Sequence, residues 1–278
     1  MTKDNYSKDI AHLGLGKATE YKESYDPSLL QSVPRKLNRD AIELIGALPF
    51  TGEDLWNGYE FSYLNKKGKP LVFLLQCRVP AESPNLIESK SFKLYLNSFN
   101  QTAFASCEEV FKRLESDLSL CAGAPINITL EPVAQSLSHQ LIDEPAECVD
   151  ELDLHFNEYH PNSSLLRTHS RYGKEYLCSH LLKSNCLITN QPDWGSIYIK
   201  YEGKLIDHCS LLKYIVSFRQ HNEFHEQCVE RIFCDILKEC SPEKLTVCAR
   251  YTRRGGLDIN PFRSNFEAPY QNIRQPRQ

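Results

Sequence analysis

The sequence is poor in the features that most directly reveal a protein's class. Gly14-Leu15-Gly16 lacks the third glycine of a dinucleotide-binding turn, so a Rossmann fold is not expected. No apolar run approaches membrane-spanning length, and the polar residues 1–6 do not begin a signal peptide. The net charge of −4 provides no footprint for nucleic acid. We therefore expect a cytoplasmic protein that binds neither membranes nor nucleic acid.

Cysteine is plentiful, but its pattern predicts neither a disulfide framework nor a metal site. The eleven cysteines are odd in number and form no CxxC pair, and several, such as Cys234, lie in apolar helical stretches. A reducing compartment is therefore expected. His208-Cys209 and His225 with Cys228 come nearest to a ligand set, and neither supplies three ligands. No metal is predicted.

The composition is that of a globular chain long enough for two domains. Of the 278 residues, 41% are apolar and 24% are charged. Residues 1–45 are polar and turn-rich, which predicts an N-terminal arm packed over the body. Residues 46–165 predict a first module with an acidic, serine-rich linker, and residues 166–278 predict a second module.

Apolar periodicity predicts the elements of the first module. Residues 59–64 and 71–79 predict two strands of a hairpin around a turn at 65–70. Residues 106–118 carry apolar side chains at helical spacing, and a further strand is expected near 126–130.

The second module shows the same order of patterns. Residues 194–201 predict a strand that ends in a turn at Glu202-Gly203. A helix is expected over 223–239, and a strand over 245–250 precedes a basic loop.

The two modules align as a diverged repeat. At a constant offset of 119 residues, Glu88 aligns with Asp207 and Ser91 with Ser210. Each half therefore predicts a hairpin, a loop, a helix and a strand, and the fold class is α+β with antiparallel sheets. Chance similarity of two amphipathic units is the alternative.

Residues 183–194 contain one cysteine in a polar setting, Cys186, and one carboxylate seven positions later, Asp193. The Asn-Gln-Pro turn between them is expected to fold Asp193 back toward the sulfur. A carboxylate there can take the thiol proton, or donate a proton to whatever the sulfur attacks. The alternative is an ordinary buried cysteine.

Two further stretches combine acids and bases. Residues 87–93 place Glu88 beside two serines and two lysines, which suits a purine-like N–H edge and a phosphate; the alternative is a charge-balanced loop. His225-Glu226 opens the predicted second helix. Its imidazole suits proton transfer, whereas a glutamate at that place also complements the helix dipole.

A basic loop follows the last predicted strand. Two arginines, Arg253 and Arg254, precede Gly255-Gly256, so backbone and guanidinium groups can approach a phosphate closely. A surface turn is the alternative.

Taken together, these motifs resemble the NADPH-dependent 7-cyano-7-deazaguanine reductases of queuosine biosynthesis, in their long, bimodular form. The motifs are Cys186 with Asp193, ESKSFK at 88–93, His225-Glu226, and RRGG with DINPFRS at 253–264. The LGKATEY and PRKLNRD stretches at 15–21 and 34–40 also match. The resemblance implies two tandem tunnelling-fold modules, whose antiparallel sheets carry helices on one face and form a barrel on oligomerisation. A homodimer is therefore expected.

The resemblance also implies a role for each motif residue. Cys186 would attack the nitrile carbon and form a covalent thioimide, with Asp193 as proton donor and His225 assisting. The deazaguanine would be held by Ile87, Glu88, Ser89, His225 and Glu226. The cofactor NADPH would contact Ser89, Lys90, Arg254 and Gly255.

The implied reaction consumes two NADPH and converts the nitrile to 7-aminomethyl-7-deazaguanine, for tRNA modification, in a pocket closed to water. Three alternatives remain open. They are a thioimide-forming nitrile hydrolase, a metal-dependent cyclohydrolase of the same fold, and a non-catalytic nucleobase-binding protein.

Overall fold

The computed structural model of the protein describes residues 24–132, 146–187, 189–275 and 277–278. The LGKATEY stretch and part of the predicted linker lie outside the described residues. The chain divides into two compact units. Unit 1 comprises Met1–Gly46, Asp54–His139 and Arg253–Asp258, and unit 2 comprises Ala47–Glu53, Gln140–Thr252 and Ile259–Gln278.

The described part of the N-terminal segment packs onto unit 1, but it is not a simple extended arm. It forms the short helix η1 (Pro27–Leu29), strand β1 (Ser32–Pro34) and helix α2 (Arg35–Ala41), and β1 pairs with β4 (Asn85–Ile87). The buried Arg35 guanidinium lies 2.5 Å from the buried Asp54 carboxylate. This ion pair fixes the PRKLNRD stretch to the module.

The hairpin predicted in unit 1 is confirmed. Most of β2 (Thr51–Asn65) and β3 (Pro70–Pro80) form neighbouring strands, and β6 (Asn127–Pro132) follows in the order β6–β3–β2. The two-residue β5 (Ala103–Phe104) pairs in parallel with the end of β2. The turn between β2 and β3 contains Gly68, whose φ of 75° favours glycine.

Of the two longer helices of unit 1, α3 and α4, the sequence predicts only α4. The predicted helix α4 (Cys107–Ala122) is capped by Ser106, whose Oγ accepts from the Glu109 N–H at 3.2 Å, and it ends at the left-handed Gly123. The predicted loop before it is wrong, because residues Ser89–Ser98 form helix α3.

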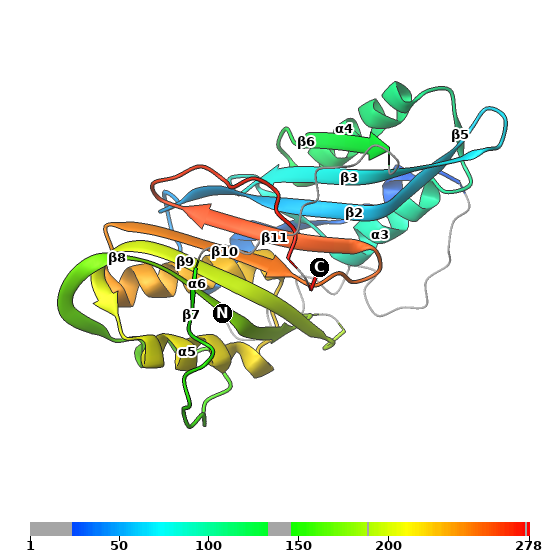
Figure 1. The fold of residues 1–278 in the computed structure, drawn as a ribbon. Helices are drawn as coiled ribbons and strands as arrows, with labels where there is room; N and C mark the ends of the chain where they lie inside the picture. The colour runs from blue at the N-terminus through cyan, green and yellow to red at the C-terminus, as the bar shows by residue number, and fades with distance from the viewer. Residues whose placement is uncertain (1–23, 133–145, 188, 276) are drawn as a thin grey trace. The chain divides into compact units, whose positions relative to one another are not determined.

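The strands of unit 2 follow the order β11–β10–β9–β8–β7 (Figure 1). All neighbours are antiparallel except β7, which runs parallel to β8. The bounds are β7 (Glu147–Cys148), β8 (Thr168–Asn185), β9 (Pro192–Ile206), β10 (Lys244–Tyr251) and β11 (Leu257–Ser264).

Two predictions for unit 2 are corrected by this sheet. The turn expected at Glu202-Gly203 is absent, because β9 continues through both residues. Gly203 serves a close approach instead, since a Cβ there would lie 2.9 Å from Pro242 Cα. The basic loop is also shorter than expected, because the DINPFRS residues form most of β11.

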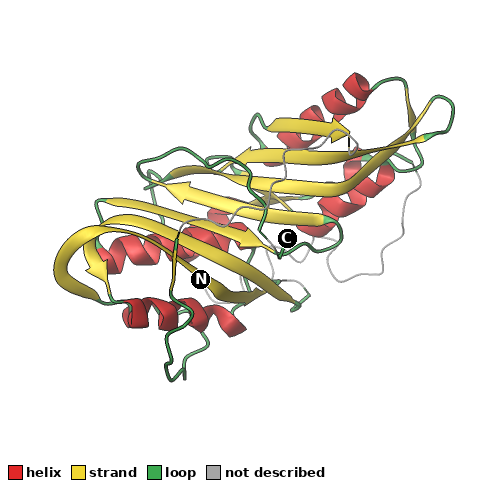
Figure 2. Ribbon diagram, viewed as in Figure 1, coloured by secondary structure: helices red, strands yellow, loops and turns green. Residues whose placement is uncertain are grey.

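Helices cover one face of the strands in unit 2 (Figure 2). The predicted helix is confirmed as α6 (His225–Cys240), and the short turns η3 (Ser163–Leu165) and η4 (Phe218–Gln220) flank α5 (His208–Ser217). The loop expected between the hairpin and the helix of each half is wrong here too, because it contains α5, as it contains α3 in unit 1. Among the described residues no helix is both long and apolar enough to cross a membrane.

The internal repeat is confirmed by matching hydrogen bonds. Ser91 Oγ donates to the Glu88 carbonyl and accepts from the Gln31 N–H, at 2.7 and 3.0 Å. Ser210 Oγ donates to the Asp207 carbonyl and accepts from the Arg167 N–H at the same distances. The α+β architecture of two modules therefore holds, while the barrel stays a prediction.

Candidate active site

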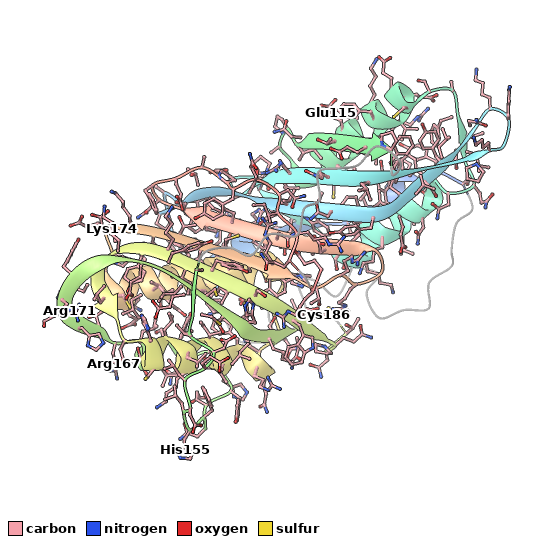
Figure 3. All side chains as sticks on the ribbon, in the orientation of Figure 1. Glu115, His155, Arg167, Arg171, Lys174 and Cys186 are labelled. Atoms are coloured by element: carbon pink, nitrogen blue, oxygen red, sulfur yellow. The ribbon has the colours of Figure 1, made fainter. Side chains whose placement is uncertain are left out.

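Cys186 lies in the short connection between β8 and β9. Figure 3 shows it at one end of β8, while Arg171 and Lys174 lie toward the other end. The Cys186 N–H donates to the Gln191 carbonyl at 2.8 Å, and the Asn190 N–H donates to the Cys186 carbonyl at 3.0 Å. Asn190 has a left-handed φ of 55°, which asparagine tolerates better than most residues. The loop thus holds a half-buried free thiol.

The chain folds back at this loop and places Asp193 on the neighbouring strand. Asp193 pairs with Ser184 in the register of β8 and β9, two residues before Cys186. The Asp193 side chain is 2% exposed, and its Oδ1 lies 3.7 Å from Nε2 of His225. The hairpin and the start of α6 therefore meet at a carboxylate–imidazole pair.

The half-buried His225 and the buried Glu226 begin α6. The His225 ring packs edge-on against the Tyr251 ring at a centroid distance of 4.0 Å. Glu226 is 3% exposed. A glutamate that only complemented the helix dipole would ordinarily remain in solvent, so its burial favours a functional role over that alternative.

Asn222 connects the start of α6 to the cysteine loop. Its Nδ2 donates to the Cys186 carbonyl at 3.2 Å and to Asn190 Oδ1 at 2.8 Å. Both contacts tie the loop to the segment that precedes His225. The backbone of the cysteine loop and the helix start are therefore positioned together.

Glu223 secures the same segment by a buried ion pair. Its carboxylate accepts from Arg231 at 2.7 and 3.1 Å and lies 3.1 Å from His221 Nε2. Burial alone would raise the pKa of Glu223, but the charges and hydrogen bonds of Arg231 and His221 outweigh it and lower the pKa to about 2. Glu223 is thus ionised at neutral pH and anchors the entry to α6.

The predicted substrate residues of unit 1 lie at the start of α3. Glu88 is the N-cap, and its two carboxylate oxygens accept from the N–H groups of Lys90 and Ser91 at 2.9 and 2.7 Å. Ile87 and Glu88 are buried, whereas Ser89 and Lys90 are half-buried. Each Glu88 oxygen accepts one of these bonds and retains a second acceptor position for a ligand.

The glycine loop of unit 1 lies beside Lys93. The Arg254 N–H donates to the Leu257 carbonyl at 2.9 Å, which closes a turn over Gly255 and Gly256, with φ of 57° and 77°. A Cβ on Gly255 would lie 3.2 Å from the Lys93 side chain. A small cavity of about 30 Å³ is lined in part by Lys93, Gly255 and Gly256.

Lys93 was not among the predicted site residues. The signal for it was present, because Lys93 follows Lys90 by three positions and the two share one helix face. The structure thus groups the predicted residues into two sets. Unit 2 contains Cys186, Asp193, His225 and Glu226, and unit 1 contains Ile87, Glu88, Ser89, Lys90, Arg254 and Gly255.

Comparison with known families identifies the class and then the family. A family model described as nitrile reductase, 7-cyano-7-deazaguanine-reductase N-terminal, matches residues 21–130, and one described as QueF-like protein matches residues 192–270. The chain is thus a nitrile reductase-type enzyme. It belongs to the 7-cyano-7-deazaguanine reductase family, in the two-module form, and this family uses NADPH. Cys186 lies between the two matched ranges.

A solved structure also resembles part of the chain. It is an archaeosine synthase QueF-Like in the apo form, with 14% sequence identity and a TM-score of 0.31. The similarity covers 36% of this chain and 99% of that one. A similarity of this size adds nothing to the family assignment.

Proposed function

We propose that the chain reduces the nitrile of 7-cyano-7-deazaguanine to the amine of 7-aminomethyl-7-deazaguanine, with NADPH, in tRNA queuosine biosynthesis. The observation that carries the proposal is the buried Asp193 carboxylate, 3.7 Å from His225 Nε2, beside the hairpin loop that presents Cys186. In a member of a nitrile reductase family, a thiol and a nearby proton donor are the groups that nitrile activation requires.

Cys186 is the nucleophile of this proposal. Its sulfur bonds to the nitrile carbon while the nitrogen gains a proton, which gives a covalent thioimide. The step is necessary because a nitrile accepts hydride poorly, whereas a protonated C=N bond is electrophilic. After the first reduction the C–S bond breaks and an imine forms, so the sulfur must both attack and leave readily.

Asp193 and His225 handle the protons. Asp193 takes the thiol proton and returns a proton to the substrate nitrogen, and His225, 3.7 Å from it, exchanges protons with the carboxylate. Burial of Asp193 helps to keep bulk water away from an imine that water would hydrolyse.

Substrate binding rests on two buried carboxylates. Glu88 and Glu226 are each 3% exposed, and a carboxylate accepts two N–H groups from the edge of a deazaguanine. Ile87, Ser89 and His225 complete the proposed set.

The residues proposed for NADPH fit an anionic dinucleotide. Lys93 lies against Gly255, where any other residue would place a Cβ 3.2 Å from the lysine side chain. Ser89, Lys90, Arg254 and Gly255 would hold the phosphates by hydroxyl, ammonium, guanidinium and backbone groups. NADPH supplies the two hydrides of the overall reaction.

The proposal is tested by mixing the full-length protein with 7-cyano-7-deazaguanine and NADPH. We expect two NADPH to be consumed for each amine formed, measured by nicotinamide absorbance and by product chromatography. Cys186→Ala should show no turnover but retain substrate binding in calorimetry. An active alanine variant would refute the role of Cys186.

The same assay separates the alternatives. A carboxamide or acid product without loss of NADPH would identify a nitrile hydrolase. Binding without any product would identify a nucleobase-binding protein. We further propose a homodimer that closes the expected barrel, and light scattering of the purified protein at twice the mass of one chain would support it.

A further inference from the structure

We propose that unit 2 contains a zinc site, separate from the reductase residues, formed by Cys148, Cys178 and His180. One donor atom from each of these side chains lies within 4.8 Å of the other two. The sequence predicts no metal, because neither of its nearest His/Cys pairs supplies three ligands. The cluster arises only when β7 and β8 pair.

Strand geometry explains how the three residues gather. Cys148 is the register partner of Cys178 in the parallel pairing of β7 with β8. The Val149 N–H also donates to the Cys178 carbonyl at 3.0 Å. Residues two apart on a strand project to the same face, so His180 joins Cys178 on the side that meets Cys148.

The donor set suits zinc. Thiolates and imidazole are the preferred ligands of zinc, and a tetrahedral site with such bonds separates its donors by about 3.3–3.8 Å. Small side-chain rotations bring donors within 4.8 Å to that spacing, because Cys148 and His180 are exposed at the surface. Water would fill the fourth position.

A neighbouring hydroxyl orients the imidazole. His180 Nδ1 lies 2.8 Å from Ser196 Oγ, which also accepts from Arg277 at 3.2 Å. A hydroxyl that accepts from Nδ1–H leaves Nε2 as the ligand atom. Metal-bound histidines commonly show this arrangement, in which the second ring nitrogen is hydrogen-bonded.

The local charge also favours a cation. Asp150 lies next to the cluster and accepts from Ser179 Oγ at 2.6 Å and from the His180 N–H at 2.7 Å. A divalent cation at the cluster would be attracted to this carboxylate.

A zinc ion at this site would hold β7 against β8 at the edge of the sheet. β7 has only two residues, and it follows the part of the linker that lies outside the described residues. None of the three ligands belongs to the proposed reductase site. The zinc site is therefore structural, and reductase constants are expected to be independent of these side chains.

Cobalt provides the most direct test. Full-length protein, reduced with a phosphine and freed of metal, is titrated with Co²⁺. We expect one equivalent to produce thiolate-to-cobalt charge-transfer bands and the visible bands of tetrahedral cobalt, both removed by Zn²⁺. Cys148→Ser and His180→Gln should each weaken binding at least about tenfold. Both positions are exposed, so both variants should fold.

Cys107→Ser is the matched control, since Cys107 is an exposed cysteine of unit 1. It should bind cobalt as the wild type does. The proposal is overturned if the bands do not appear, if they persist at full affinity in both ligand variants, or if Cys107→Ser abolishes them.

Discussion

Ser91 and Ser210 make the same two hydrogen bonds in the two modules, and Tyr95 and Tyr214 both donate to an aspartate on the following helix, Asp117 and Asp235. The two helix starts are thus built alike. The hairpin connections that precede them differ. In unit 1 the connection is a lysine-rich turn around Gly68, whereas in unit 2 it carries Cys186.

The second helices of the modules differ in a similar way. Glu108 of α4 is exposed and pairs with Lys112 one turn later, at 2.6 Å. Its equivalent in α6, Glu226, is buried and follows His225. The scaffold of the module is therefore shared, and the residues proposed for catalysis in unit 2 lie at a hairpin connection and a helix start that differ from their equivalents in unit 1. Five predictions test this division.

The largest effect is expected at Asp193, the second residue of β9. Asp193→Asn removes the proposed proton donor and should lower kcat about 10²–10⁴-fold, the usual contribution of acid–base catalysis. Leu71, the second residue of β3, is the equivalent position in unit 1. Leu71→Asn should leave kcat nearly unchanged in steady-state assays, and equal losses would contradict the division.

The next effect concerns stability. Glu223→Gln leaves Arg231 without its buried partner and should lower the free energy of unfolding by about 3 kcal/mol. Glu109→Gln, which removes the exposed Glu109–Arg113 pair of unit 1, should cause no measurable change. Trp194 reports unit 2 in urea titrations when Trp56, the buried tryptophan of unit 1, is replaced by phenylalanine in both proteins.

The stability contributed by Glu223 should depend on pH, because the pKa of this carboxylate is lower in the folded protein than in the unfolded chain. The pKa of Glu223 is about 2 in the folded protein, below the unfolded value, so its stabilisation is complete above about pH 5 and declines as the pH falls toward 2. The difference between wild type and Glu223→Gln should therefore shrink from pH 6 to pH 3. A constant difference would contradict the assignment.

A smaller effect is expected on substrate binding. Glu226→Gln replaces one of the two acceptor oxygens of the carboxylate by an NH2 donor, which cannot accept from the substrate, and should raise the Michaelis constant of the nitrile about 10–100-fold. Glu108→Gln is the matched change in unit 1 and should leave it unaltered. A comparable rise in both variants would indicate a general structural disturbance.

The smallest effects are expected at Ser91 and Ser210, the equivalent serines of the two modules. Ser91→Ala and Ser210→Ala each remove two hydrogen bonds and should destabilise their own module by about 1–2 kcal/mol in urea titrations. Only Ser91→Ala should also raise the Michaelis constant of the nitrile, since Ser91 contacts Glu88. If Ser210→Ala raises it equally, the modules do not divide their work as described.

The sequence predicts those parts of the fold that local chemistry determines. The β2–β3 turn, α4 and α6 follow from glycine, caps and apolar spacing. Residues 92–96 instead alternate as a strand would, so α3 was missed. The Glu202-Gly203 turn was wrong because that glycine is required by Pro242, a contact distant in sequence.

The candidate site also has parts that the sequence predicts and parts that depend on contacts distant in sequence. The Asn-Gln-Pro turn predicts that Asp193 folds back toward Cys186, and the register confirms that the chain reverses there. The Asp193–His225 contact, the support from Asn222 and Glu223, and the position of Lys93 beside Gly255 depend on tertiary packing. No spacing along the chain indicates them.

Intact-protein mass spectrometry with 7-cyano-7-deazaguanine, in the absence of NADPH, tests the central claim most directly. A mass increase equal to one whole substrate molecule is predicted, located by peptide mapping on Cys186 and absent from Cys186→Ala. An adduct on any other cysteine, or no adduct on a protein that still turns over with NADPH, would contradict the account.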